Sequence, residues 1–366
     1  MTQEQLHAFL ILQRIPNLGD TSIKRLLNRF ETPQNVLAQK KRILLDVDGI
    51  GEHRLKDFFN KEHAVEAEKE LKFIEENAIE YSCYLDRDYP ERLKHCIDGP
   101  VLVFKRGKAK YDNPKIISVV GTRKVTSYGI EFIKKFIEEL APLNPVIVSG
   151  FAYGVDITAH KAALEFGLET IAVLAHGLNQ IYPKIHHKYV NAVEAQGAFI
   201  TDFWSSDSFD RTNFLRRNRI IAGISEATVV IESAEKGGSL VTADIANSYD
   251  RDVFAVPGRA EDPQSLGCNN LIKTQKAQLI TSAADLVYML NWNVDNILKP
   301  VQKQLFVELN EDEKTIFNYL SENGKEQLDF IALNCKMPTF KIAGILLNME
   351  LKGVVRPLPG KQFELA

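Results

Sequence analysis

The spacing of hydrophobic and polar positions changes along the chain and divides it into three stretches. Residues 1–80 place apolar residues three or four apart, as at Leu6, Phe9 and Leu10, which predicts an all-helical domain. In residues 81–290, short β-branched runs alternate with helical stretches, which predicts a parallel or mixed sheet covered by helices. Residues 306–366 predict three helices and a hairpin, and residues 291–305, around Pro300, are predicted to be a linker.

Two glycine-containing turns in the first stretch each join a pair of predicted helices. Residues 15–19 lead into a helix from Thr21, and residues 47–51 lead into another from His53. Helix, glycine hairpin and helix form the helix-hairpin-helix pattern of a SAM-like domain. The backbone N–H groups of such hairpins can contact DNA phosphates without reading sequence. The same pattern also serves as a packing module without DNA, and both interpretations stay open.

Seven strands are predicted in the central stretch, and several end at a glycine. Their positions are residues 116–120, 146–149, 170–174, 198–201, 228–231, 253–256 and 277–280. The first three and the fifth lead into glycine turns, and the carboxyl ends of strands in an open α/β sheet line the crevice that binds ligands. Glycine lets the backbone approach a phosphate, and a following helix start favours an anion. No turn matches a dinucleotide or P-loop motif, which argues against an NAD enzyme or an ATPase.

Cationic and aromatic residues gather around these turns. The cationic residues are Arg123, Lys124, Lys184, Arg216, Arg217 and Arg219, and the aromatic residues are Tyr128, Phe151, Tyr153, Tyr182 and Phe214. Cations interleaved with aromatics suit single-stranded nucleic acid, because unpaired bases can stack on aromatic rings. For any one of these aromatics, packing in the core is the alternative explanation.

Catalysis is the competing interpretation of the same stretch. Ser149, Asp156, His160 and His176 are the candidates for a nucleophile, base and acid set, but Ser149 does not lie in a nucleophile elbow. Asp156 and His160 are four residues apart on a predicted helix and could simply pair with each other. His186 and His187 have no third ligand at a useful spacing. We therefore predict no catalytic residue, no metal and no cofactor, and keep a nucleotide hydrolase on a Rossmann-like fold as an alternative.

Composition and charge narrow the class of protein. The formal net charge is −3, so nucleic acid would have to bind a local basic patch. Cys83, Cys96, Cys268 and Cys335 are scattered without metal or disulfide spacing, which predicts a cytoplasmic protein. The first residues do not resemble a signal peptide, and no apolar run approaches the roughly 20 residues that span a bilayer.

The last stretch matches a winged-helix plan. Helices are predicted over residues 312–320, 327–335 and 338–351, followed by a two-stranded wing over residues 354–365. The third helix carries only Lys341, with Lys336 just before it, which is few cations for phosphate binding. Protein contact or regulation therefore competes with DNA binding here, and a winged-helix DNA-binding regulator is a further alternative.

A set of motifs in fixed order closely resembles the DNA-processing protein A family (DprA, also called Smf) over about residues 80–285. The motifs are SVVGTR at residues 118–123, SGFAYGVD at 149–156, Tyr182–Pro183, FLRRNRIIAG at 214–223, GSLVTA at 238–243, VPG at 256–258 and GCNNLI at 267–272. The layout resembles a full-length member with a helical N-terminal domain, an extended Rossmann-like domain and a C-terminal winged helix.

The resemblance implies a function and a set of contact residues. It implies a homodimeric, non-enzymatic protein that binds single-stranded DNA, protects incoming DNA and loads the RecA recombinase onto it in natural transformation. By motif position, it implies DNA contacts from Arg123, Lys184 and the Arg217–Arg219 motif. Together with the glycine turns, the predicted DNA-binding residues are Gly121, Thr122, Arg123, Gly150, Phe151, Lys184, Arg217, Asn218, Arg219, Gly237, Gly238 and Ser239.

Overall fold

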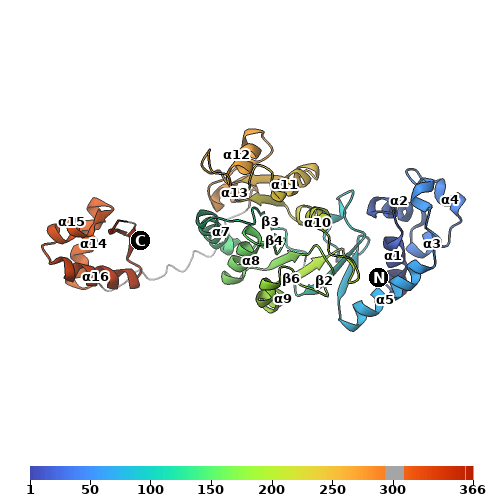
Figure 1. Cartoon of the computed structure of the whole chain (residues 1–366), viewed down its shortest axis with the longest axis horizontal. Helices are drawn as coiled ribbons and strands as arrows, with labels where there is room; N and C mark the ends of the chain where they lie inside the picture. Colours follow the sequence, from blue (N-terminus) through green and yellow to red (C-terminus); the bar gives the residue numbers. More distant parts are fainter. Residues whose placement is uncertain (110, 293–308, 359, 366) are drawn as a thin grey trace. The chain divides into compact units, whose positions relative to one another are not determined.

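The computed structural model describes residues 1–109, 111–292, 309–358 and 360–365. They form two compact units, divided between residues 296 and 297. The first unit holds the N-terminal helices and a large sheet, and the second holds the C-terminal domain (Figure 1). Residues 293–305 of the predicted linker lie outside the described residues, and the predicted boundaries between the domains stay a prediction.

The N-terminal domain is helical, as predicted, but its second hairpin differs from the first. Its elements are α1 (Gln3–Arg14), α2 (Asp20–Phe30), α3 (Pro33–Leu37), α4 (Lys41–Leu45), the 3-10 helix η1 (Glu52–Leu55) and α5 (Glu62–Glu76). Thr2 and Gln5 form a capping box that starts α1. The helix predicted from His53 is only a 3-10 turn. Leu55, the last residue of η1, and Phe58, in the turn that follows it, are both buried.

The central sheet has the strand order β1-β2-β6-β5-β4-β3-β7-β8-β9. The seven strands from β3 to β9 pair in parallel and occupy the predicted positions. Their bounds are β3 (Ile116–Val120), β4 (Val146–Ser149), β5 (Thr170–Val173), β6 (Ala198–Thr201), β7 (Ala227–Val230), β8 (Asp252–Ala255) and β9 (Gln278–Leu279). The inner strands are buried along their length, which explains their continuous apolar sequences.

Two antiparallel strands at one edge were not predicted. They are β1 (Glu80–Cys83) and β2 (Leu102–Gly107), which pair with each other, and β2 also pairs with β6. Helix α5 ends at Glu76, and the chain then enters β1 at Glu80. β1 is four residues long and mixes exposed with buried positions, so its sequence gives a weak strand signal.

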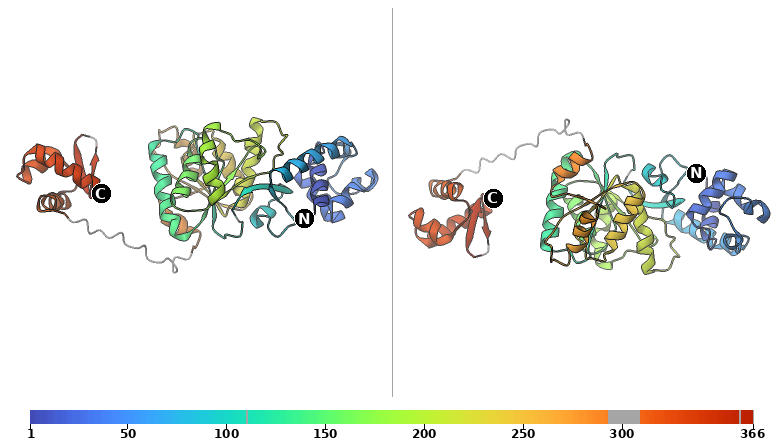
Figure 2. Two further views of the ribbon diagram at one scale, coloured as in Figure 1. Left: turned by 90° about the horizontal axis from the view of Figure 1, so that it is seen from below. Right: turned by 90° about the horizontal axis from the view of Figure 1, so that it is seen from above.

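Helices cover both faces of the sheet (Figure 2). Helices α7 (Ser127–Leu140), α8 (Val155–Glu165) and α9 (Val190–Gln196) connect β3 to β6 and pack side by side. Helix α10 (Arg211–Ile224) connects β6 to β7, and helix α11 (Gly238–Ser248) connects β7 to β8. The two helices pack against each other. The remaining elements of this unit are α6 (Glu91–Lys94), η2 (Ala141–Leu143), η3 (Lys184–Tyr189), α12 (Leu266–Lys273) and α13 (Ala283–Met289).

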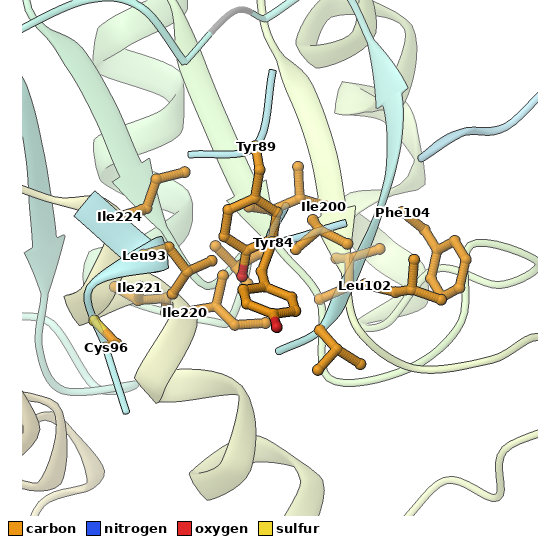
Figure 3. Close-up of a cluster of buried hydrophobic side chains, with 14 of the residues drawn as sticks. Tyr84, Tyr89, Leu93, Cys96, Leu102, Phe104, Ile200, Ile220, Ile221 and Ile224 are labelled. Carbon is orange, nitrogen blue, oxygen red and sulfur yellow. The ribbon is translucent and has the colours of Figure 1, made fainter. Parts of the chain in front are cut away.

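Helix α10 is anchored by an apolar cluster between the sheet and α6 (Figure 3). Ile220, Ile221 and Ile224 of α10 are at most 1% exposed and lie with Tyr89 and Leu93 in this cluster. The Tyr89 hydroxyl donates a hydrogen bond of 2.6 Å to the carbonyl of Pro100. Burial of each isoleucine stabilises the fold by about 2–3 kcal/mol. The anchor fixes the rotation of α10 and so decides which of its arginines face solvent.

The second unit is a winged helix, as predicted. It contains α14 (Glu311–Asn323), α15 (Leu328–Asn334), α16 (Thr339–Leu351) and a three-stranded sheet of β10 (Glu326–Gln327), β12 (Gln362–Leu365) and β11 (Val355–Leu358). Its own core includes Ile316, Leu320, Ile331, Ile342 and Leu346. An α/β core with a helical N-terminal domain and a winged helix confirms the predicted fold class.

None of the described helices is by itself both long and apolar enough to cross a bilayer; α15 and α16 reach that length and composition only when joined across a 109° bend.

Candidate nucleic-acid interface

A cleft of about 830 Å³ opens at the carboxyl edge of the sheet, where β3 and β7 lie side by side. From β3 the chain proceeds to β4 on one side and later returns to β7 on the other, which is the point where open α/β sheets bind ligands. The cleft is lined by the turns after β3, β4 and β7 and by one face of α10. The turn after β5, at His176–Gly177, was predicted to share this crevice but is not part of its lining.

The charge of this cleft is strongly positive. Five cationic side chains line it against a single carboxylate, that of Asp156. The cationic residues are Arg123, Lys124, Arg211, Arg217 and Lys236. Four of the five are exposed, and only Arg217 is buried. A surface of this kind attracts an anion although the whole chain has a net charge of −3.

The turn after β3 is held rigidly and presents Arg123 to solvent. The Thr122 amide donates to the Glu232 carbonyl at 2.7 Å, and the Thr126 amide donates to the Glu232 carboxylate at 2.9 Å. One residue at the end of β7 therefore fixes both ends of the turn. The Arg123 guanidinium lies 5.2 Å from the centre of the Phe214 ring and, in the described parts of the chain, forms no ion pair. Its charge is thus available to a ligand.

The turn after β7 offers backbone N–H groups to the same cleft. Helix α11 starts at Gly238, and its N-cap, Gly237, has no side chain to satisfy the first amides. A Cβ atom added at Gly238 would meet nothing within 4 Å, so this backbone faces open space. The Ser239 hydroxyl is buried and donates to the Ser233 hydroxyl at 2.9 Å. Amides at a helix start, with Lys236 beside them, suit a phosphate group.

Three aromatic rings lie together in the lining of the cleft. Tyr182 lies 4.7 Å from Phe209 and 6.0 Å from Phe214, measured between ring centres, and Phe209 lies 5.6 Å from Phe214. Tyr182 is 40% exposed and Phe209 46% exposed, so both retain free ring surface. Phe209 was not predicted as a site residue: it lies in the loop before α10, and no sequence pattern distinguishes it from a core aromatic.

Arg217 is part of the cleft lining, but its side chain is buried and does not face solvent. Its guanidinium is buried beside Asp156 and donates to the carbonyls of Gly150, at 2.8 Å, and Val173. A Cβ atom at Gly150 would come within 2.4 Å of this guanidinium, so Gly150 is glycine because Arg217 packs on it. Burial lowers the pKa of Arg217 to about 10. Burial likewise raises the pKa of Asp156, an effect that the Arg217 charge opposes.

Arg219 does not join Arg123 in this cleft. It forms ion pairs with Asp202, at 2.5 Å, and with Asp20 of the N-terminal domain, at 2.9 Å. It lines a second cleft of about 990 Å³ between that domain and the sheet. There, five arginines face five carboxylates: Arg14, Arg25, Arg54, Arg216 and Arg219 against Asp20, Glu62, Glu66, Asp202 and Asp207. The second cleft is larger, but its charges balance, so it is the poorer site for a polyanion.

The other predicted residues divide between the cleft and the core. Gly121, Thr122, Asn218 and the Gly237–Ser239 turn line the cleft with Arg123. Phe151 is fully buried, with its ring against those of His160, His186 and Phe199. Lys184 is exposed at the start of η3, two residues beyond Tyr182, but is not part of the lining.

The catalytic candidates are not assembled into a reactive set. Ser149 is buried and donates to the Val119 carbonyl at 2.7 Å. His160 is fully buried, and its Nδ1 lies 2.7 Å from the Thr170 hydroxyl, which itself donates to the Ile147 carbonyl. Nδ1 therefore carries the proton, and Nε2 is buried without a partner. Within the described residues, no three His, Cys, Asp or Glu side chains are grouped so as to hold a metal ion.

The burial of His160 predicts a loss of stability in mild acid. Burial lowers the pKa of His160 from 6.5 to about 3. Between these values the unfolded chain binds a proton that the folded protein does not, so stability is complete above pH 6.5 and falls as the pH decreases. We expect His160→Gln to reduce the slope of the unfolding free energy against pH by up to about 1.4 kcal/mol per pH unit. Urea unfolding at pH 7, 6 and 5 measures this slope. Equal slopes in the two proteins would contradict this assignment.

Fold and cleft together define a Rossmann-like, polyanion-binding protein with helical domains at either end of the chain. The family model for DNA recombination-mediator protein A matches residues 80–291, and the DprA winged-helix model matches residues 303–361. The chain belongs to the DNA recombination-mediator protein A family.

Individual relatives agree with this membership. Protein Smf of Escherichia coli is 34% identical over 281 residues, which cover 76% of this chain and 75% of that protein. The crystal structure of DNA processing protein A from Streptococcus pneumoniae covers 79% of this chain and 98% of its own, with a TM-score of 0.66 and 29% identity. The same protein from Helicobacter pylori, whose structure concerns its single-stranded DNA binding mode, covers 58% of this chain and 96% of its own, with a TM-score of 0.52 and 29% identity.

Proposed function

We propose that the cleft between β3 and β7 binds single-stranded DNA. The observation that carries the proposal is that exposed cations and clustered aromatic rings line the same cleft. The exposed cations and the α11 amides suit phosphates, and Tyr182 and Phe209 suit bases. In a duplex the bases are stacked on each other and their faces are hidden. Only an unpaired strand can therefore use the cations and the aromatic rings of the cleft together. The single-stranded DNA binding of the Helicobacter pylori relative supports this assignment.

The residues of the predicted set have different roles in this proposal. Arg123, Lys124, Arg211 and Lys236 contact the DNA backbone directly, and Lys184 extends the contact beyond Tyr182. The amides of Gly121 and Gly237–Ser239 bind phosphate at the two turns, and Thr122 holds the first turn in shape through its amide hydrogen bond to Glu232. Arg217, Gly150, Asn218 and Phe151 shape the wall from beneath. Arg219 holds the N-terminal domain against the sheet.

The protein acts, in this proposal, as a recombination mediator and not as an enzyme. It covers incoming single strands, protects them from nucleases and loads the RecA recombinase, as a homodimer in the cytoplasm. Membership of a recombination-mediator family supports this role. The separation of Ser149 and His160 from the cleft by burial weakens the alternative of a nucleotide hydrolase.

The test is a titration of a labelled oligo-dT strand and of a duplex of equal length, followed by fluorescence anisotropy at several salt concentrations. We expect a strong preference for the single strand. Arg123→Ala should weaken binding roughly ten- to hundredfold, because a charged hydrogen bond contributes about 1.5–3 kcal/mol. It should also reduce the slope of log K against log salt by about 0.7, the value for one phosphate contact on a single strand.

A matched control removes an arginine elsewhere on the surface. Arg29 is exposed on α2 and does not line the cleft, so Arg29→Ala should bind DNA as the wild type does. Equal affinity of the Arg123→Ala and Arg29→Ala proteins for the single strand would remove the basis of the proposed site.

A further inference from the structure

Helix α16 exposes a second apolar face that its own domain leaves uncovered. Ile342, Leu346 and Met349 form the face that packs into the winged-helix core. On another face, Phe340, Ala343, Gly344 and Leu347 are all exposed, and Phe340 to Ala343 and Gly344 to Leu347 are each three residues apart, whereas Phe340 to Gly344 and Ala343 to Leu347 are four apart. Phe340 is 82% exposed and Leu347 57% exposed. These spacings place the four residues in one stripe along the helix.

The glycine in this stripe has no explanation within the domain. Gly344 lies in the middle of α16, where glycine destabilises a helix relative to alanine. A Cβ atom at Gly344 would meet nothing within 4 Å, so packing inside the domain does not require its absence. A missing side chain in an exposed stripe allows the backbone of another helix to approach closely.

DNA is a poor occupant for this face. In DNA-binding domains of this type the corresponding helix enters the major groove, beside the phosphates. Its only cationic residue is Lys341, and the Lys341 ammonium forms an ion pair of 2.8 Å with Asp312. Phosphate binding depends on cations, whereas this face presents Phe340 and Leu347. The chemistry of the stripe therefore fits an apolar protein surface.

We propose that α16 packs antiparallel against α16 of a second copy of this chain, with the two helices crossing at Ala343–Gly344. The stripe is symmetric about this point, because Phe340 lies three residues before Ala343 and Leu347 three residues after Gly344. A two-fold axis there places Phe340 of each copy against Leu347 of the other. A surface that is complementary to itself is what a two-fold dimer requires.

The charges at the ends of the helix fit the same arrangement. Lys336, just before α16, and Glu350, near its end, are both exposed. In an antiparallel pair crossing at residues 343–344, Lys336 of each copy comes close to Glu350 of the other. The pairing thus brings together opposite charges twice, whereas a parallel pair would bring like charges together at each end.

The area of this contact sets its expected strength. One helix face buries much less than the roughly 800 Å² per partner of a typical stable interface. We therefore expect weak association between separate molecules. In an assembly that already holds two copies together, the effective concentration of one α16 near the other is raised to the millimolar range, and the contact can form.

Cross-linking of the full chain tests the geometry directly. The four natural cysteines are buried, so a cysteine introduced on the surface can be cross-linked selectively by a short bis-maleimide. Ala343→Cys, which keeps Gly344 and adds only a sulfur atom at the crossing point, should give covalent dimers at least tenfold faster than the control Ser321→Cys, which places a thiol at an exposed position of α14. Adding Leu347→Glu to Ala343→Cys should reduce the rate to that of the control.

Two outcomes would overturn the proposal. One is equal cross-linking at positions 343 and 321, or cross-linking at 343 that Leu347→Glu does not reduce. The other is co-sedimentation with phosphatidylcholine vesicles that Leu347→Glu abolishes, without cross-linking at 343, which would assign the stripe to a membrane surface. The proposal is independent of the DNA site: DNA titrations of Leu347→Glu and Arg123→Ala should show loss only in the latter, so either proposal can fail alone.

Discussion

Arg217→Ala should reduce the free energy of unfolding by about 2–6 kcal/mol, because two buried carbonyls lose their donor and each such loss costs about 1–3 kcal/mol. The guanidinium is buried between Asp156 and the carbonyls of Gly150 and Val173, which come from three different segments. Without it, the Asp156 carboxyl group stays buried with no cation beside it, and both carbonyls lose a charged donor. DNA binding should weaken as well, because the turn after β4, at Gly150, loses its support from α10.

Urea unfolding and DNA titration together show whether Arg217 supports the structure of the cleft or contacts DNA directly. Arg123→Ala is the matched variant in the same cleft, and its unfolding free energy should stay within about 0.5 kcal/mol of the wild type, since Arg123 is exposed. Adding Asp156→Asn to Arg217→Ala should recover part of the lost stability, because the buried charge is removed with its partner. An Arg217→Ala protein that is fully stable yet binds DNA poorly would make Arg217 a contact residue instead.

The sheet and its glycine turns could be predicted from the sequence because burial on both faces leaves a local signal. Strands such as Ile116–Val120 and Ala227–Val230 are continuous apolar runs, and each is followed by a turn that contains glycine. Parallel strands with their carboxyl ends on one edge then bring these turns together. The edge strand β1 has no such signal, since half of its short sequence faces solvent.

The roles of the arginines on α10 could not be predicted in the same way. Arg216, Arg217 and Arg219 are close in sequence, but the helix rotates them to different sides. Arg216 is exposed, Arg217 is buried beneath the cleft, and Arg219 pairs with Asp20, which lies 199 residues away in the sequence. A motif shows that these residue types are present. Their partners are decided by tertiary packing, and only the structure shows which charge remains free.

Tyr182 and Phe214 line the cleft as the sequence suggested, whereas Phe151 and Phe209 do not follow the sequence pattern, for a related reason. Phe151 follows a strand and a glycine, which suggested a ligand contact. Its backbone has a positive φ of 56°, and its side chain is buried in the core. Phe209 has no motif around it, yet its ring is exposed beside Tyr182. A glycine turn indicates where a ligand can approach the backbone, whereas the direction of each side chain depends on the packing of the loop that carries it.

Removal of both exposed rings, Tyr182→Ala with Phe209→Ala, should weaken binding of single-stranded DNA by at least about thirtyfold. Stacking contributes roughly 1–3 kcal/mol per base, and the two rings can each hold one base. The rings carry no charge, so the salt dependence of binding should remain that of the wild type, in contrast to Arg123→Ala. Anisotropy titrations with oligo-dT at several salt concentrations measure both quantities.

A strand that lacks bases makes this prediction specific to stacking. An abasic oligonucleotide keeps every phosphate, so it should bind the double variant and the wild type with nearly equal affinity. Phe59→Ala is the control for loss of an exposed aromatic, because Phe59 is 55% exposed in the N-terminal domain and does not line the cleft. If the double variant lost the same affinity for abasic and for normal strands, the rings would be maintaining the shape of the cationic wall, and the bases would bind elsewhere. If it lost affinity only for the normal strand, the cations of the cleft would bind phosphates and its exposed rings would bind bases. A paired strand cannot offer both contacts at once.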